Sequence, residues 1–349
     1  MNQRRVTQSD VAKRAKVTQT TVSLAMRHHA SLPESTRARI ISLAAKMGYR
    51  PDPMLSSLVA YRWSASPAGF QGVLAWVTNY ATENGWCNGQ QMGYFNGAAQ
   101  RARALGYKLE TIWLRQPDMT PERMQQILLT RNIQGLLLAP QPQPHTVVQL
   151  AWDRFSAVTF GYSMQHPQLH MVMNHQFRNM AILVRRLHEL GHRRVGFAMP
   201  ASQNERVEQS YLAGFLVEQA KLRKADRVPH LLDSRFDRRR FFRWFLKHEP
   251  AIIVTDIKTA PQIQAWLKEA GRRIPIDVGL ALPNVPFGDD FYSGIDENPL
   301  LVGATGVDAV VGMIHRAEQG VPENPRYILI EGQWFPGRSI GARPRTLRG

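Results

Sequence analysis

The segment VTQSDVAKRAKVTQTTVS, residues 6–23, decides the fold predicted for the N-terminal part of the chain. Thr7 and Asp10 are three residues apart, which is the spacing of a capping box, although an acid stands where Glu or Gln is usual. A short helix is therefore expected at about 8–15, and a second one at about 19–26. Two short helices joined by a tight turn are the sequence form of a helix-turn-helix.

The residues around this segment complete a small helical unit. Lys16 falls in the predicted turn, and Thr18 can cap the second helix. A third helix is expected at about 34–47, because its apolar residues form one stripe and Gly48 follows as a usual helix-ending residue. A Pro-rich break then leads to a further short helix at about 54–60 and to a linker at 64–69.

The charge of the chain points to a polyanion. The 349 residues carry 44 Lys and Arg against 27 Asp and Glu, a net charge of +17. Eleven of the basic and only three of the acidic residues lie within 1–62, so this segment alone carries +8. Such asymmetry favours a nucleic-acid partner, and the alternative is a basic protein that its charge keeps in solution.

Composition excludes several other classes. A single cysteine rules out a disulfide framework and a multi-cysteine zinc site. No apolar run approaches the ~18–20 residues of a membrane span, and no apolar stretch follows the basic N-terminus as in a secretory signal. We therefore expect a soluble, cytoplasmic, nucleoid-associated protein with no membrane partner.

From residue 70 the sequence alternates between short apolar runs and helical segments. This alternation predicts mostly parallel sheets with helices on both faces, and about 270 residues exceed one comfortable core, so two lobes are expected. The predicted strands lie near 73–77, 109–114, 135–139, 157–160, 195–199, 251–255 and 278–282. The predicted helices lie near 94–105, 121–130, 176–190, 209–222, 238–247, 259–270 and 299–318.

Residues 6–62 closely resemble the headpiece of the LacI/GalR family of bacterial transcription regulators. The matching text is residues 6–23, Thr36-Arg37, MGYRPDP at 47–53 and residues 54–58. HELGHRRV at 188–195, GRRIPIDV at 271–278 and GRS at 337–339 match the rest of the family more weakly.

This resemblance implies a fold, a set of domains and a function. The fold is an all-α helix-turn-helix headpiece plus an α/β two-lobed core like that of a periplasmic binding protein. The domains are the headpiece at 1–50, a hinge helix and linker at 51–69, and an effector-binding and dimerisation core at 70–349. The function is that of a repressor that binds a near-palindromic DNA operator as a homodimer and is gated by a small sugar-like or related metabolite.

The resemblance also assigns residues on the DNA side. The positions expected to face the bases are Gln19, Thr20, Ser23 and Leu24, and those expected to touch phosphates are Thr7, Thr18, Arg27, Ser31 and Thr36. Leu55 and Leu58 are the hinge residues at the minor groove, where Leu58 matches the leucine that relatives insert between bases. The alternatives are solvated helix surface, local capping, and packing of the hinge helix. Leu24 departs from the Arg that many relatives carry there, which puts the family's familiar operator sequence in doubt. Lys16 is a second departure, because Gly is common at that turn.

The effector site is expected between the lobes, at the carboxyl ends of strands. The candidates are Asn79, Tyr80, Trp86, Tyr162, Arg206, Tyr211, Asp256 and Asn284. The alternative for each is an ordinary surface or core residue. The family's familiar sugar-binding set is incomplete, because Tyr211 and the pairs Asn174-His175 and Thr255-Asp256 depart from it. Whether the effector is an ordinary hexose, and whether there is one, therefore stays open.

No catalytic constellation accompanies these residues. The sequence lacks a Gly-x-Ser-x-Gly elbow, a phosphate-binding Gly-rich loop with Lys-Ser/Thr, and His-Glu-x-x-His. We therefore expect no enzyme, no cofactor and no metal, although His188 and His192 have a spacing that could hold one. The alternatives to a gated regulator are a solute-binding receptor, a sugar-handling enzyme on a similar core, and an architectural DNA binder without a functional effector.

Overall fold

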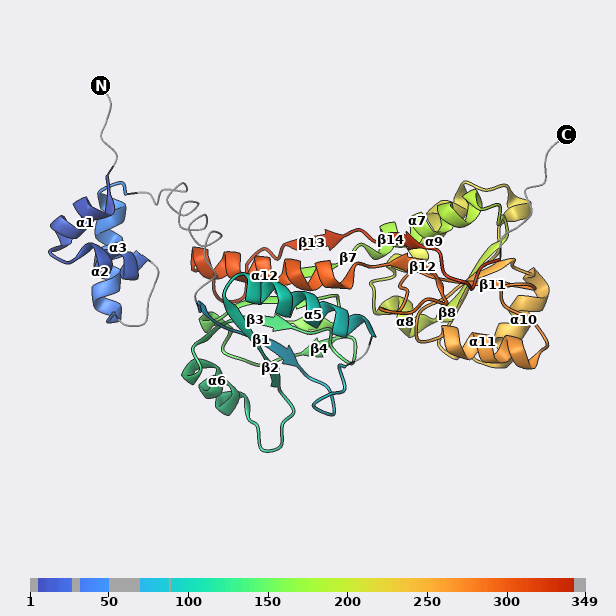
Figure 1. Cartoon of the computed structure of the whole chain (residues 1–349), viewed down its shortest axis with the longest axis horizontal. Coiled ribbons are helices and arrows are strands. Elements are labelled where there is room, and N and C mark those ends of the chain that lie inside the picture. The colour runs from blue at the N-terminus through green and yellow to red at the C-terminus, as the bar shows by residue number, and fades with distance from the viewer. Residues whose placement is uncertain (1–5, 27–31, 50–69, 88, 342–349) are drawn as a thin grey trace, which may run out of the picture.

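The computed structural model describes residues 6–26, 32–49, 70–87 and 89–341, and in it a helical headpiece precedes two α/β lobes (Figure 1). The headpiece contains α1 (Gln8–Ala15), α2 (Gln19–Met26) and α3 (Glu34–Lys46). They pack around one apolar cluster, which consists of Val11, Ala12, Ala15, Val22, Ala25, Ile40 and Ala44. The predicted helix-turn-helix is thus present, whereas the helix expected at 54–60 lies outside the described residues.

The first helix of the headpiece begins and ends where the sequence predicts. The backbone N–H of Thr7 donates to Asp10 Oδ2 at 2.8 Å, and the N–H of Asp10 donates to Thr7 Oγ1 at 3.3 Å, which completes the capping box. Lys16 adopts the left-handed conformation, with φ 57°, where the family usually has glycine. A residue with a Cβ carries some strain there, so the turn between α1 and α2 is made at a small cost.

Lobe 1 is built on a six-stranded parallel sheet. Its strand order is β13-β7-β5-β3-β1-β2. The strands are β1 (Gly72–Thr78), β2 (Tyr107–Trp113), β3 (Ile133–Leu138), β5 (Ser156–Phe160), β7 (His170–Asn174) and β13 (Tyr327–Ile330). Helices α5 (Gly89–Ala104) and α12 (Pro299–Arg316) cover one face, and α6 (Pro121–Thr130) covers the other. A 3₁₀ turn, η1 (Trp152–Arg154), and a two-stranded sheet of β4 (Thr146–Val147) and β6 (Met164–His166) complete the lobe.

Lobe 2 repeats this arrangement with a different last strand. Its order is β14-β12-β11-β10-β8-β9, and β14 runs antiparallel to β12. The strands are β8 (Val195–Pro200), β9 (Leu231–Asp233), β10 (Ile252–Val254), β11 (Gly279–Leu282), β12 (Ser293–Asp296) and β14 (Gln333–Phe335). Helices α7 (Gln176–Glu189) and α9 (Ser210–Ala220) cover one face, and α10 (Arg238–His248) and α11 (Ala260–Glu269) cover the other. Short helices α8 (Ala201–Glu205) and η2 (Lys224–Asp226) lie in the connections.

The chain crosses between the lobes three times. The crossings lie between β7 and α7, between β12 and α12, and between β13 and β14. Each leaves the carboxyl end of a strand, so the carboxyl ends of both parallel sheets face one another. This arrangement places the loops that follow the strands at the junction between the lobes, as the sequence predicts.

Two differences from the predicted elements concern short strands and the start of one helix. Strands β7, β9, β12, β13 and β14 are not among the predicted strands, because runs of three to five residues carry little periodic signal. The helix expected at 94–105 begins earlier, at Gly89. No helix in the described ranges is both long and apolar enough to cross a membrane.

Glycines set the close contact between α5 and α12 in lobe 1. A Cβ at Gly303 would overlap the carbonyl oxygen of Tyr94, and a Cβ at Gly97 would overlap that of Leu300. The two helix backbones therefore approach one another at positions that admit no side chain. This contact holds a helix from the N-terminal half of the core against one that follows all of lobe 2 except β14 in the sequence.

Candidate DNA-binding surface and interlobe site

The N-terminal end of α2 is the exposed part of the helix-turn-helix. Val22 and Ala25 are fully buried in the headpiece cluster, so the opposite side of the helix faces outward. Gln19 and Thr20 are exposed on that side, and Leu24 is half-buried. Ser23 lies in the same helix. The chemistry available at this end is therefore a carboxamide, a hydroxyl and an apolar side chain, which can read adenine, any base edge and a thymine methyl respectively.

The residues expected to contact phosphates differ in their exposure and in their local hydrogen bonds. Thr18 Oγ1 accepts the backbone N–H of Thr21 at 3.1 Å, so Thr18, like Thr7, caps its own helix. Both threonines are exposed, whereas Thr36 is half-buried on the first turn of α3. Lys13, Arg14 and Lys16 add exposed positive charge at the end of α1 and at the turn. The predicted contacts at Arg27, Ser31, Leu55 and Leu58 lie outside the described residues.

Between the lobes, Arg206 makes a direct link. It follows α8 in lobe 2, and its guanidinium donates to the carbonyl oxygens of Gln141 and, at 3.2 Å, Pro142, which follow β3 in lobe 1. Tyr80 approaches the same segment, because its hydroxyl donates to the carbonyl of Pro140 at 3.3 Å and accepts from Gln91. Burial lowers the pKa of Arg206 from its ordinary value, although the side chain stays a cation at neutral pH.

Glu297 forms the centre of a buried polar cluster at the second crossing. Its carboxylate accepts the amide of Gln90 at 2.9 Å and a hydrogen bond from Tyr211, so it joins α5 of lobe 1 to α9 of lobe 2. Burial raises its pKa from 4.5 to about 7, against the opposing effect of these hydrogen bonds. Nearby, the amide of Asn174 donates to the Tyr94 hydroxyl at 2.8 Å. Sequence patterns did not predict Glu297, because a lone acid ahead of a helix is an ordinary surface feature.

Two of the other predicted effector residues, Asp256 and Trp86, are buried and have local contacts. Asp256 is buried, but it accepts the backbone N–H of Lys258 at 2.9 Å and of Thr259 at 3.2 Å, so it forms the turn that leads into α11. Burial raises its pKa above the usual range. Trp86 packs in the lobe 1 core, with its ring 5.9 Å from that of Trp76.

Three further predicted effector residues lie in loops that follow strands β1, β5 and β11. Asn79 accepts a hydrogen bond from Arg115 at 3.1 Å. Tyr162 meets the ring of Tyr327 edge-on at 6.3 Å, and the oxygen of the Asn284 amide is buried with no protein partner among the described residues. The structure thus brings Tyr80 near Arg206, and Tyr211 near both Glu297 and Asp256. Trp86 packs in the lobe 1 core, and the binding of an effector by any of these residues stays a prediction.

Hydrogen-bond acceptors are in excess around the interlobe contacts. The amide nitrogen of Gln90 donates to a carboxylate, and that of Gln141 donates to the Ala139 carbonyl at 2.7 Å, so the orientation of both amides is fixed. Their oxygens are buried without a partner in the described part of the chain. These two oxygens, one on the amide that bonds Glu297 and one on the residue whose carbonyl accepts from Arg206, favour a group that donates hydrogen bonds, such as a hydroxyl.

A basic helix-turn-helix headpiece and a two-lobed core with three crossings define a transcription regulator with a DNA-binding domain and a periplasmic-binding-protein-like domain. Residues 7–52 match the family of bacterial regulatory proteins called lacI, and residues 184–340 match the periplasmic binding protein-like domain. This chain belongs to the LacI family.

Solved structures share this fold over all or most of the chain. A complex of the transcriptional regulator CelR with cellobiose has a TM-score of 0.55 at 16% identity and covers 96% of this chain and 100% of its own. The lac repressor dimer bound to operator and the anti-inducer ONPF has a TM-score of 0.53 at 17% identity and covers 96% of this chain and 99% of its own. A LacI transcriptional regulator from Rhodococcus has a TM-score of 0.55 at 13% identity, covering 77% and 98%. These identities show a shared fold, and no curated protein sequence matches the chain.

Proposed function

We propose that this protein is a sequence-specific transcription repressor that binds a near-palindromic DNA operator as a homodimer and responds to a small molecule held between its lobes. The observation that carries the proposal is the exposed end of α2, where Gln19 and Thr20 project from a basic headpiece. Its expected place of action is the nucleoid in the cytoplasm.

The base contacts follow from this geometry. The N-terminal end of the second helix enters the major groove, where Gln19 bonds adenine and Leu24 meets a thymine methyl. Thr7, Thr18, Arg27, Ser31 and Thr36 hold the phosphates and set the register. Two-fold symmetry of the dimer places a second copy of the helix on the other half-site. The hinge residues Leu55 and Leu58 would insert at the centre and kink the duplex.

The proposed gate is the set of contacts that join the lobes. Arg206 bonds carbonyls of the opposite lobe, and Glu297 bonds a side chain from each lobe, so a ligand that enters there must replace or reinforce those bonds. The excess of acceptors favours a hydroxyl-rich, sugar-like effector, in keeping with the cellobiose bound to CelR. Coupling between such a site and the headpiece is expected to be about 1–3 kcal/mol.

The first experiment is the selection of bound sequences from a random duplex pool at near-physiological salt, with the full-length protein. Recovery of a two-fold symmetric site supports the proposal. Recovery of no preferred sequence, with or without an added metabolite mixture, contradicts it and favours an architectural DNA binder. Binding of a sugar without any binding of DNA would instead indicate a solute receptor.

Substitutions then test the residues on the selected site. Gln19→Ala is expected to weaken specific binding by roughly 5- to 150-fold, since a bidentate base contact is worth about 1–3 kcal/mol. Gln8→Ala, in the first helix, is the matched control and should change the affinity little. Leu58→Ala should weaken specific binding far more than binding to random DNA at the same salt concentration. Equal losses on both duplexes would exclude insertion of Leu58.

A further inference from the structure

A second concentration of positive charge lies in lobe 2. Residues 221–247 contain ten Lys and Arg against three Asp, a net charge of +7 in 27 residues. Lobe 1, residues 70–174 and 297–330, contains nine basic and nine acidic residues and is neutral. The excess charge of the core is therefore local, and it lies in a lobe that is separated from the headpiece by lobe 1 (Figure 1).

Many of these cations have no acidic partner. Lys221 pairs with Glu218 at 2.9 Å, Arg223 pairs with Asp226 at 3.1 Å, and Arg240 pairs with Asp233. Other exposed cations of this part of lobe 2 form no ion pair within the described ranges, namely Arg193, Lys224, Arg227, Arg239, Arg243 and Lys247. Among the described residues, Arg227 bonds the backbone carbonyls of Leu222 and Ala220 and no carboxylate.

Three of the unpaired cations form one stripe on α10. Arg239, Arg243 and Lys247 are spaced four residues apart, which places them on the same side of the helix over about 12 Å. The opposite side of α10 is buried through Phe241, Trp244 and Phe245. Because this apolar side fixes the helix on its sheet, the stripe is presented outward on a rigid support.

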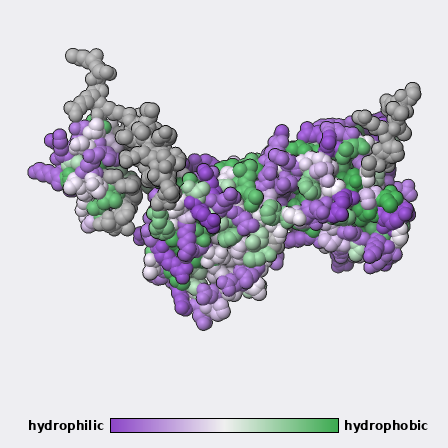
Figure 2. All heavy atoms as spheres, in the orientation of Figure 1, coloured by the Kyte–Doolittle hydropathy of each residue, from purple (hydrophilic) through white to green (hydrophobic). Residues whose placement is uncertain are grey.

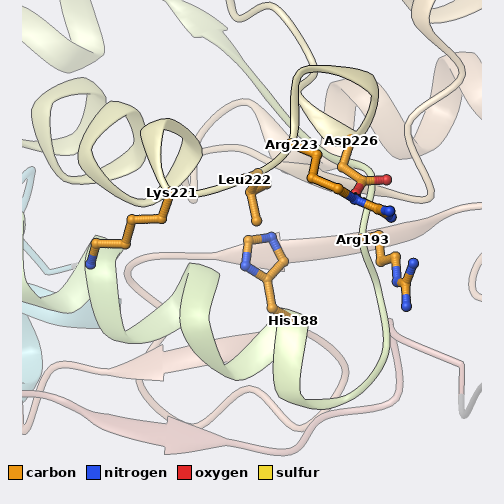
Figure 3. Close-up of a pocket in the computed structure, with 6 residues that line it drawn as sticks. All are labelled: His188, Arg193, Lys221, Leu222, Arg223 and Asp226. Atoms are coloured by element: carbon orange, nitrogen blue, oxygen red, sulfur yellow. Dashed lines mark hydrogen bonds and ion pairs between the residues drawn. The ribbon is translucent and has the colours of Figure 1, made fainter.

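Two cavities lie near the β9 edge of the sheet, and each has cations in its wall. One, of about 380 Å³, lies between the ends of α7 and α9, where His188 faces the turn that carries Lys221 and Arg223, with Arg193 on the other side (Figure 3). The second, of about 550 Å³, has Lys224 and Arg227 in a wall that is otherwise mainly apolar, with Leu216, Val228 and Pro229. In the space-filling view, hydrophilic side chains are mixed with hydrophobic ones at this end of lobe 2 (Figure 2).

We propose that this surface of lobe 2, the α10 stripe together with the cations of the β9 edge, binds the phosphate backbone of a second DNA duplex. The proposal goes beyond the proposed function, because it does not involve the headpiece. Arginine predominates among the cations, and a guanidinium binds phosphate in a fixed, two-pronged geometry. The large exposed apolar side chain on α10 is Leu246, so the stripe lacks the aromatic residues that are enriched in protein interfaces.

The binding mode follows from the charges. Contacts to phosphates carry no sequence information, so the lobe 2 surface would hold any duplex. Because the headpiece and this surface belong to different ends of the chain's fold, one molecule could contact two separate stretches of DNA. The consequence would be bridging of the operator region to a neighbouring segment.

The test compares three full-length proteins on a random-sequence duplex of about 30 base pairs. The first is the wild type, and the second carries Arg239→Gln, Arg243→Gln and Lys247→Gln. The third is a control with the same loss of charge on the neutral lobe, Arg103→Gln, Arg123→Gln and Arg154→Gln, all exposed. Removal of three phosphate contacts should reduce the salt-dependence slope of log K by about 2–3, whereas the control should change it little.

A second measurement tests bridging directly. One labelled duplex is immobilised, and capture of a second, differently labelled duplex through the protein is recorded. The wild type and the control should capture it, and the α10 variant should not, although it still binds the first duplex. Unchanged melting temperatures of both variants show that the fold is intact.

Several outcomes would overturn the proposal. The first is an α10 variant whose salt-dependence slope and capture of the second duplex equal those of the control. The second is displacement of the second duplex by a poly-glutamate peptide at a lower concentration than by unlabelled duplex, which would indicate an acidic protein partner. Gln19→Ala separates this proposal from the function proposed above. Loss of specific binding in Gln19→Ala with no effect of the α10 variant leaves the repressor function standing and removes the second surface. The reverse pattern removes the operator contact and leaves the second surface standing.

Discussion

The two lobes share a strand order, yet they differ in almost everything outside their cores. Each sheet runs from a late strand at one edge to the second strand of the lobe at the other. Lobe 1 is electrically neutral and joins α5 to α12 through glycines, whereas lobe 2 concentrates its cations at the β9 edge and on α10. The comparison teaches that apolar faces determine the topology, while net charge is free to serve other purposes.

The largest loss of stability is expected at the close contact between α5 and α12 of lobe 1. Gly303→Ala should destabilise the protein by more than about 3 kcal/mol, beyond the usual cost of overpacking, because the overlapped atom is a backbone oxygen on α5. Chemical denaturation measures the loss. Gly214→Ala, between α7 and α9 of lobe 2, should cost less, since its Cβ would lie 2.5 Å from the Phe177 oxygen. Gly312→Ala in the same helix as Gly303 meets only the far end of Arg316, so a loss there would contradict this explanation.

The next largest effect is the dependence of stability on pH that arises from the buried Glu297 carboxyl. Burial raises the pKa of Glu297 to about 7, whereas its value in an unfolded chain is near 4.5. The folded state therefore binds a proton between these values, and stability falls as the pH rises from 4.5 to 7 and is constant above. At 1.36 kcal/mol per pKa unit this amounts to about 3 kcal/mol. Glu297→Gln should abolish this part of the pH dependence of thermal unfolding.

Glu318 in lobe 1 provides the opposite case. Its hydrogen bond with Arg316 lowers its pKa to about 2, so its contribution to stability is present above pH 4.5 and is lost as the pH falls toward 2. Glu318→Gln should therefore change the acid side of the profile and leave the region from 5 to 7 unaltered. The same response in both variants would show that Glu297 does not titrate as described.

A smaller effect on stability and overall size is expected from arginine hydrogen bonds that join the two lobes, compared with those inside one lobe. Arg206→Ala removes the bonds to the Gln141 and Pro142 carbonyls and should increase the radius of gyration in small-angle scattering, with a cost of about 2 kcal/mol. Arg227 also bonds two carbonyls, but both lie in lobe 2. Arg227→Ala should leave the scattering profile unchanged, and an equal expansion in both would remove the gating role of Arg206.

The smallest effect is expected at the charges beside the glycine contact. Arg101 and Asp308 join α5 to α12 at 2.7 Å, but both side chains are nearly half exposed. Water screens such a pair, so Asp308→Asn should cost no more than about 0.5 kcal/mol in the same denaturation assay. A loss comparable to that of Gly303→Ala would mean that charge, and not close packing, holds the two helices.

The sequence predicted the parts of the molecule whose cause is local. The capping box at Thr7, the turn at Lys16 and the alternation of strands and helices each arise within a few residues. The edge strands β13 and β14 were not predicted, because they depend on partners more than 30 residues away. Glu297 was missed for the same reason: its burial is produced by Gln90 and Tyr211, which only the three crossings bring to it. Trp86 was assigned to the effector site on its chemistry alone, and its place in an aromatic cluster follows from contacts with Trp76 and Phe95.

The order of the three crossings has a consequence for synthesis on the ribosome. Lobe 1 receives α12 and β13 only after all of α7–β12 has been made, and lobe 2 receives β14 later still. During translation the glycine-lined side of α5 and the adjacent face of the sheet thus stay uncovered until residues 299–330 emerge. A nascent chain that ends near residue 298 carries two unfinished sheets with open edges, which makes that stage the one at which a chaperone would be needed most.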